Sequence, residues 1–246
     1  MPSPYPCPYP RVLLKISGEA LASDTCGKII DHAMVAQIAN EISQIHADLQ
    51  TEFAIVIGGG NIWRGARGAA NGMNRTIADD IGMMATIMNS LAMKDALTQL
   101  GVDSRVMSAL PIHKVCEDWI PARALSHLGK GRVVICAAGL GEPNFTTDTA
   151  AVQRAIQLKV DVLLKGTHGT VLGIYDKDPA TNDDAILLPN LTYDEVIKLR
   201  LKVMDPTAFT HAEDAKLPTV VFNIMKPGRI TDAIMGKPIG TLVTAS

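Results

Sequence analysis

The sequence contains no run of the ~18 apolar residues that a membrane-spanning helix needs. It also lacks an excess of one charge, because 23 Lys and Arg residues and 25 Asp and Glu residues give a formal net charge of −2. With no cluster of Lys and Arg, this balance argues against a protein that binds nucleic acid through bulk charge. We therefore expect a globular cytoplasmic protein with neither a membrane nor a nucleic acid as partner.

Cysteine is scarce, and none of the four residues at positions 7, 26, 116 and 136 forms a C-x-x-C pair. Free thiols in a reducing compartment are the simplest interpretation. The first ten residues contain five prolines and no apolar segment of a secretory signal, so 1–10 is predicted to be a proline-rich flexible tail. Several catalytic signatures are also missing: H-E-x-x-H, G-x-S-x-G, the Walker A loop and G-x-G-x-x-G.

The sequence does contain an alternation of strand and helix patterns. Uninterrupted apolar runs are typical of strands buried on both faces, and such candidates lie at 12–16, 53–57, 104–107, 132–136, 161–164, 219–222 and 241–243. Helix patterns occupy 32–47, 76–100, 193–200 and 206–215. The third helix begins with a Thr192/Glu195 capping box, and the fourth with Asp205-Pro206. The alternation predicts an α/β fold, a three-layer αβα sandwich with a mostly parallel central sheet.

The long helix pattern at 76–100, followed by Gly101, is apolar on all sides. Its apolar residues include Ile77, Ile81, Met83, Met84, Ile87, Met88, Leu91 and Met93. Such a helix lies deep in a core or is covered by a partner subunit.

Three glycine-bearing turns follow predicted strands, at 15–20, 58–65 and 138–143. Glycine lets backbone N–H groups approach an anion closely, and a following helix N-terminus adds positive potential. Each turn alone could hold glycine for steric reasons. Three in one chain, two of them beside a cation, favour a phosphate-binding site at the carboxyl ends of the strands.

Transfer of a phosphoryl group needs cations and well-placed donors. The candidate cations are Lys15, Arg64, Lys165 and Lys202. Lys15 is the most informative, because it lies within an apolar strand, where an unpaired charge is costly; the alternative is a lysine at a sheet edge or one that reaches solvent. Asp148 is either a site residue or an acid in the first turn of a helix, and Asp205 is explained by an N-cap role alone.

In this order, these pieces resemble the bacterial uridylate kinases of the amino acid kinase fold family, over about residues 11–244. The resemblance rests on VLLKISGEAL (12–21), VIGGGNIWRG (56–65), GMNRTIADDIGMMATIMNSLAM (72–93), FTTDTAA (145–151), LKVMDPTAFTHA (201–212) and MGKPIGTL (235–242). It implies a single domain over 11–246, with a UMP-binding part at roughly 11–160 and an ATP-binding part at roughly 161–246. The implied reaction is transfer of the γ-phosphate of Mg-ATP to UMP in pyrimidine nucleotide biosynthesis.

The resemblance also implies roles for single residues. The catalytic set would be Lys15 on the transferring group, Asp148 orienting the lysines, Lys202 as the second lysine, and Asp205 at the phosphate or Mg²⁺ site. ATP would contact Lys15, Ser17, Gly18, Gly60, Arg64, Thr167, Tyr175 and Asp178. UMP would contact Gly59, Asp79, Leu140, Gly141, Glu142, Pro143, Asn144, Phe145, Thr146 and Thr147. Mg²⁺ would bridge the phosphates, and no residue is assigned as its ligand.

The family resemblance further implies a homohexamer with GTP and UTP as effectors. The chain departs from the usual family sequence at Leu140 and Glu142, in a 165–179 segment that is two residues longer and carries Leu172, and in the loop 24–31. Two alternatives follow: a kinase of the same fold with another acceptor, such as a carboxylate or carbamate, and a nucleotide-binding sensor or storage protein with weakened catalysis.

Overall fold

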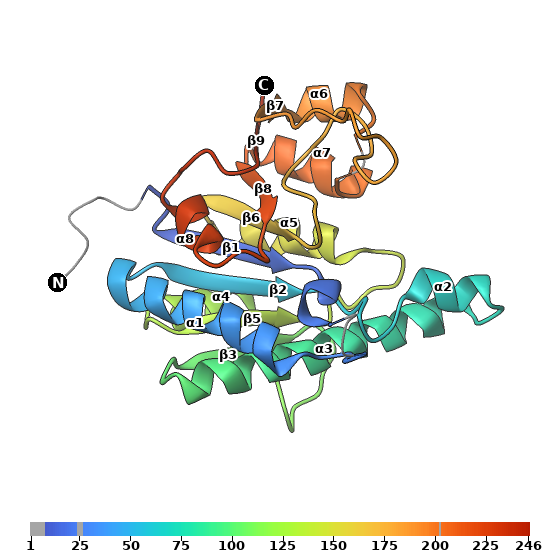
Figure 1. Ribbon diagram of the computed structural model, residues 1–246. Helices are drawn as coiled ribbons and strands as arrows, with labels where there is room; N and C mark the ends of the chain where they lie inside the picture. Colours follow the sequence, from blue (N-terminus) through green and yellow to red (C-terminus); the bar gives the residue numbers. More distant parts are fainter. Residues whose placement is uncertain (1–7, 24–26, 202) are drawn as a thin grey trace.

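A nine-stranded sheet forms the centre of the computed structural model, which describes residues 8–23, 27–201 and 203–246 (Figure 1). Its order is β4-β3-β5-β2-β1-β6-β8-β9-β7. The strands are β1 (Arg11–Ile16), β2 (Glu52–Ile57), β3 (Ser104–Ser108), β4 (Glu117–Asp118), β5 (Val133–Ala137), β6 (Val162–Thr167), β7 (Asn190–Thr192), β8 (Thr219–Asn223) and β9 (Thr241–Thr244). Within the described residues only the β8–β9 pair is antiparallel, so the mostly parallel sheet is confirmed.

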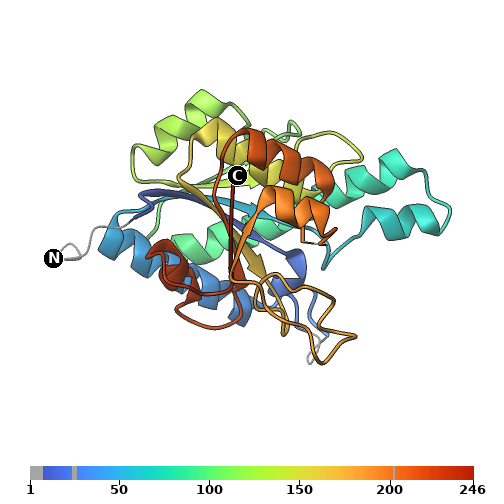
Figure 2. The same cartoon turned by 90° about the horizontal axis from the view of Figure 1, so that it is seen from above.

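Helices cover both faces of this sheet, which confirms the three-layer prediction (Figure 2). One face packs against α1 (His32–Leu49), α3 (Arg75–Gln99) and α8 (Arg229–Ile234). The other packs against α4 (Pro121–Leu128), α5 (Thr147–Leu158), α6 (Tyr193–Lys198) and α7 (Pro206–Asp214). The short 3₁₀ helix η1 (Gly18–Leu21) follows β1, and α2 (Gly65–Ala70) projects with the start of α3 beyond the sheet (Figure 1).

The central strands are apolar throughout because both of their faces are covered. In β1, Val12 and Leu14 pack into one core and Leu13 into the other, as expected when successive side chains point to opposite faces. β1 lies between β2 and β6. Lys15 is therefore on a central strand, and the edge-strand alternative for this residue is wrong.

The predicted helix ends are also found. The Thr192/Glu195 capping box opens α6, and the Asp205 carboxylate accepts a hydrogen bond from the Ala208 N–H at the start of α7, at 2.9 Å. Gly101 adopts a left-handed φ of 77° just after α3. These local signals fix where the helices begin and end, and thereby which loops are free to form a site.

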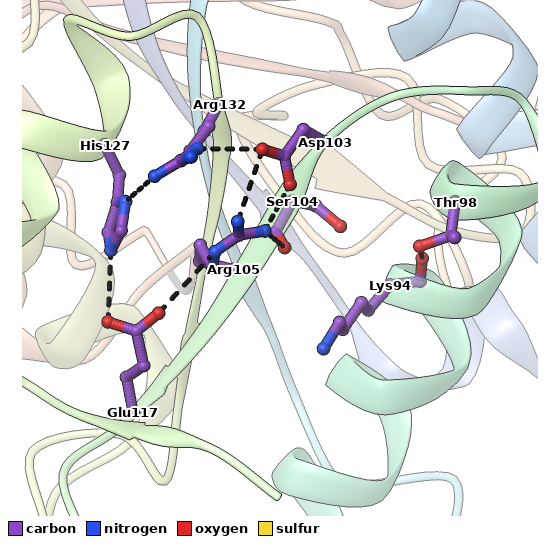
Figure 3. A network of polar contacts seen from close by, with 8 residues as sticks. All are labelled: Lys94, Thr98, Asp103, Ser104, Arg105, Glu117, His127 and Arg132. Carbon is purple, nitrogen blue, oxygen red and sulfur yellow. Dashed lines mark hydrogen bonds and ion pairs between the residues drawn. The ribbon is translucent and has the colours of Figure 1, made fainter.

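Charged side chains join the elements at the β3–β4 edge of the sheet (Figure 3). Glu117 Oε2 lies 3.1 Å from His127 Nε2, and His127 Nδ1 lies 3.1 Å from an Arg132 nitrogen. Arg132 in turn donates to Asp103 Oδ2 at 2.8 Å, and Arg105 pairs with both Asp103 and Glu117. This network connects β3, β4 and α4 at the edge of the sheet.

Among the residues that the structure describes, no helix combines the length and the apolar character needed to cross a bilayer. Cys116 and Cys136 are buried free thiols, as predicted, and burial raises the pKa of Cys136 to about 12. Cys7, Cys26 and the first seven residues of the proline-rich tail lie outside the described residues.

Replacing Tyr193 by Phe should lower the free energy of unfolding by about 1–2 kcal/mol. The Tyr193 side chain is fully buried, and its hydroxyl bonds the Leu217 carbonyl and Thr219 Oγ1, both at 2.7 Å. Urea denaturation measures the change. In a double-mutant cycle, Thr219→Val should lower the free energy of unfolding less in the Tyr193→Phe background than in the wild type. Strictly additive losses would contradict the hydrogen bond between Tyr193 and Thr219.

Candidate active site

Two lysines from neighbouring strands meet one carboxylate at the carboxyl edge of the sheet. β1 and β6 are parallel and in a register that pairs Lys15 with Lys165. The Nζ atoms of Lys15 and Lys165 lie 2.8 and 2.6 Å from the same Oδ1 of Asp148, in the first turn of α5. Both lysines are buried. The two ammonium groups repel each other, and the carboxylate that they share offsets this repulsion.

Lys165 is the part of this cluster that the sequence interpretation missed as a catalytic residue. It was a candidate cation, but the second lysine was assigned to Lys202, which lies outside the described residues, so that role stays a prediction. A signal for Lys165 was present: the tetrapeptide Val-Leu-Leu-Lys occurs at 12–15 and again at 162–165. Two such strands pairing in parallel bring both lysines to the same edge.

The electrostatics of the cluster favour an anion. Burial alone would raise the pKa of Asp148, but the ammonium groups of Lys15 and Lys165 outweigh it and lower this pKa to about 2. For Lys165, burial and the charge of Lys15 lower the pKa to about 8, and Asp148 and Asp205 offset this only in part. Near neutral pH the cluster therefore carries two positive charges on one negative charge.

A cavity of about 540 Å³ opens beside the cluster, where all three predicted glycine-bearing turns converge. It is lined by thirteen of the predicted site residues: Lys15, Ser17, Gly18, Gly59, Gly60, Arg64, Asp79, Leu140, Glu142, Phe145, Thr146, Thr147 and Asp148. The structure thus brings together side chains from β1, the loop after β2, α3 and the loop after β5.

Close backbone packing explains the glycines of the first two turns. A Cβ atom on Gly18 would lie 2.5 Å from Asn61 Oδ1 and 2.7 Å from the Gly58 carbonyl oxygen. One on Gly59 would lie 2.8 Å from the Gly82 carbonyl oxygen of α3. The two turns lie against each other and against α3, so no larger residue fits without a shift of backbone.

Glu19 is a second residue that the sequence interpretation missed. Its carboxylate accepts hydrogen bonds from the Ser17 hydroxyl and from the Arg64 guanidinium. Burial would raise the pKa of Glu19, but the bonds from Ser17, its own backbone and Arg64 lower it. Glu19 therefore holds Ser17 and Arg64, two of the predicted ATP-contacting residues, in the wall of the first cavity.

The loop 138–147, which includes the first residue of α5, follows β5. It contains four residues with left-handed φ: Ala138, Gly139, Gly141 and Asn144. The Asn144 N–H donates to Asp79 Oδ2 at 2.9 Å, and Arg75 Nε donates to the same oxygen at 2.8 Å. Gly141, Pro143 and Asn144 do not line the cavity, unlike the other predicted residues of this loop. Asn144 instead joins the loop to α3 through its backbone.

A second cavity, of about 480 Å³, begins at Lys165 and contains the predicted Thr167, Tyr175 and Asp178. Val171, Gly173, Ile174, Leu201, Val203 and Val221 make much of its wall apolar. The Lys15–Asp148–Lys165 cluster thus stands between two cavities, with Lys15 and Asp148 lining one and Lys165 the other.

Asp205 lines neither cavity but joins two helices beside the cluster. Its carboxylate caps α7 and also accepts hydrogen bonds from the hydroxyls of Thr149, at 2.8 Å, and Thr146. It therefore joins the start of α7 to the start of α5, which carries Asp148. Among the described residues, no group of three or more His, Cys, Asp or Glu side chains is placed to hold a metal ion.

Comparison with known proteins gives consistent matches. The model of the Amino acid kinase family matches residues 10–223. The protein named "Uridylate kinase" from Oenococcus oeni is 49% identical over 239 residues, covering 97% of this chain and 98% of that protein. Its namesake from Xanthomonas campestris pv. campestris is 50% identical over 236 residues, covering 96% of each. The crystal structure of UMP kinase from Bacillus anthracis superposes with a TM-score of 0.91 at 40% identity, covering 96% of each chain.

The electrostatics predict that one lysine titrates near pH 8 in the ligand-free protein. NMR of lysine side chains should show this midpoint in the wild type, and the signal should be lost in Lys165→Met. In Asp148→Asn the midpoint should fall further, because the carboxylate that favours the charged ammonium is gone. Lys130→Met, at an exposed position, should leave the midpoint in place. An unchanged midpoint in Asp148→Asn would contradict the shared ion pair.

Proposed function

Because the chain belongs to the amino acid kinase family, alongside relatives named uridylate kinase, we propose that it transfers the γ-phosphate of ATP to UMP, giving ADP and UDP. The observation that carries this proposal is the cluster of Lys15, Lys165 and Asp148 between two cavities. A phosphoryl group passing from one cavity to the other would pass the two ammonium groups.

In this proposal UMP occupies the first cavity and ATP the second. Asp79 accepts hydrogen bonds from the ribose of UMP, and the loop 138–147 encloses the rest of the nucleotide, with Leu140 and Glu142 facing it. Thr167, Tyr175 and Asp178 hold the adenosine of ATP in the largely apolar second cavity. The triphosphate extends from there towards Lys165, Ser17 and Gly18.

The chemistry needs charge neutralisation more than proton transfer. The UMP phosphate is already ionised and attacks the γ-phosphorus directly, so the account needs no general base. Lys15 and Lys165 stabilise negative charge on the transferring oxygens, and Asp148 holds both ammonium groups in place. When phosphates arrive, they raise the pKa of Lys165 and keep it protonated.

Mg²⁺ fits this site as an ion carried by the nucleotide. The described residues offer no cluster of three metal-binding side chains, and Mg²⁺ commonly binds through substrate phosphates and water with few protein ligands. Such an ion would neutralise part of the negative charge of the phosphates. Location in the cytoplasm and the effectors GTP and UTP stay predictions.

An exposed apolar stripe on α3 supports the homohexamer as a further part of the proposal. Ile77, Ile81, Met84 and Met88 recur at helical spacing and are between 36% and 53% exposed, whereas Met83, Ile87 and Met93 of the same helix are buried in the core. A contiguous apolar stripe of this kind on a surface helix fits contact with another subunit.

An assay of ADP release with Mg-ATP tests the proposed reaction. We expect turnover with UMP, and none with the carboxylates aspartate and acetylglutamate. Lys15→Met and Lys165→Met should each lower kcat by about 10²–10³, the loss typical when one charge-stabilising donor is removed. Lys130→Met, at an exposed position, serves as the control. Turnover with another acceptor but not with UMP, or equal rates for wild type and Lys15→Met, would contradict the proposal. Nucleotide binding without any turnover would favour the sensor alternative.

Placing a charge in the stripe should dissociate the assembly. Ile81→Glu together with Met88→Glu would bury two carboxylates in an apolar contact, which is strongly unfavourable. Light scattering after gel filtration should show a smaller species than the wild type. Gln99→Glu adds a charge to an exposed position of the same helix and should leave the mass unchanged. A wild-type monomer, or a double variant of wild-type mass, would refute this contact.

A further inference from the structure

The loop 138–147 begins with two consecutive residues in the left-handed region, Ala138 at φ 59° and Gly139 at φ 57°. Glycine adopts this conformation freely, but a residue with a Cβ atom does so at a cost. Such a conformation persists only where the surrounding structure holds it. Contacts to the peptide groups of these two residues therefore fix the start of the loop.

Two side chains from opposite faces of the sheet hold this pair. The Ala138 N–H donates to Thr86 Oγ1 at 2.8 Å, and an Arg154 nitrogen donates to the Gly139 carbonyl at 2.8 Å. Thr86 lies on α3, which packs on one face, and Arg154 on α5, which packs on the other. Both side chains are almost fully buried.

Each of these side chains is itself fixed in orientation. The Thr86 hydroxyl donates to the Met83 carbonyl at 2.7 Å, which leaves its lone pairs to accept from Ala138. Arg154 donates to Gln157 Oε1 at 2.9 Å, and its guanidinium lies 4.2 Å from the ring centre of Trp119. No ion pair joins Arg154 to a carboxylate within the described part of the chain. A buried guanidinium without a counter-ion is costly, and a backbone carbonyl takes the place of one here.

We propose that Thr86 and Arg154 are positioning residues for the acceptor: they clamp the peptide groups of Ala138 and Gly139, so that the loop 138–147 keeps the shape that receives UMP. The inference rests on the proposed function, because it takes this loop as the acceptor side. Thr86 lines the first cavity, whereas Arg154 does not. An effect of Arg154 on UMP binding must therefore pass through the loop, and Arg154→Met is the variant that separates the clamp from direct contact with the nucleotide.

Kinetics of four variants test the clamp. Thr86→Val keeps the shape of the side chain but leaves the buried Ala138 N–H unpaired, and Arg154→Met removes the donor to Gly139. We expect each to raise KM for UMP about tenfold, the cost of one unsatisfied buried group, with KM for ATP unchanged. Thr86→Ser, which keeps the oxygen, should behave like the wild type, and Arg154→Lys should be intermediate, because it has no planar fork.

Thr98→Val is the matched control. Thr98 lies on the same helix, and its hydroxyl also donates to a backbone carbonyl one turn earlier, that of Lys94, at 2.8 Å (Figure 3). It is exposed and far along α3 from the loop. Its loss should change neither KM. Equal increases in KM for UMP and ATP in Thr86→Val would indicate a general structural defect and would overturn the proposal, as would unchanged values.

Hydrogen exchange provides a readout that does not depend on activity. Peptides covering 134–147 of the ligand-free protein should exchange faster in Thr86→Val and Arg154→Met than in the wild type or Thr98→Val. Unchanged exchange would overturn the clamp even if KM changed. If the wild type turned over no UMP, the proposed function would fail, and faster exchange in both variants would still support the clamp itself.

Discussion

One carboxylate shared by two buried ammonium groups is the interaction on which the site depends. Asp148 lies in the first turn of α5, and Lys15 and Lys165 reach it from β1 and β6. The contact requires that these strands be adjacent, parallel and in register. It also requires that α5 begin where it does, and Asp205 reinforces this by bonding the hydroxyls of Thr146 and Thr149. The three charged groups can therefore meet only if the strands and α5 are arranged as they are in this fold.

The charges of the cluster do not balance when no ligand is bound. Among the described residues, Lys15 and Lys165 form ion pairs only with Asp148, and Asp205 is a more distant negative charge. Burial and the neighbouring charge of Lys15 therefore lower the pKa of Lys165. Phosphate oxygens supply the missing negative charge. The glycine turns beside the cluster bring backbone close to the same space. The protein thus prepares a charge distribution that suits a phosphoryl group in transfer better than it suits water.

Much of the architecture could be predicted, because it depends on local signals. Uninterrupted apolar runs mark strands covered on both faces, and caps such as Thr192 and Asp205 mark the starts of helices. Short elements such as β4, β7 and α2 were missed, because two to six residues carry no measurable periodicity. Lys15 and Asp148 were found through the resemblance and through an ammonium group placed in an apolar strand.

The remaining site residues depend on tertiary contacts that no local pattern records. Lys165 becomes a partner of Asp148 only through the register of β1 with β6, and Glu19 only because Arg64 folds back onto it. Thr86 and Arg154 act on backbone groups of a distant loop, so their side-chain types alone say nothing of the role.

Leu140 and Glu142 do line the first cavity, which makes their departure from the family sequence relevant to the choice of acceptor.

The central claim is that a phosphoryl group in transfer lies between Lys15 and Lys165. The most direct measurement is a crystal structure with a compound in which adenosine and uridine are joined by five phosphates. The account predicts that adenosine lies in the Thr167–Tyr175 cavity and uridine beside Asp79. Both ammonium groups should then lie within hydrogen-bond distance of the central phosphates. A phosphate chain that bypasses Lys165, or a uridine bound outside the first cavity, would contradict it.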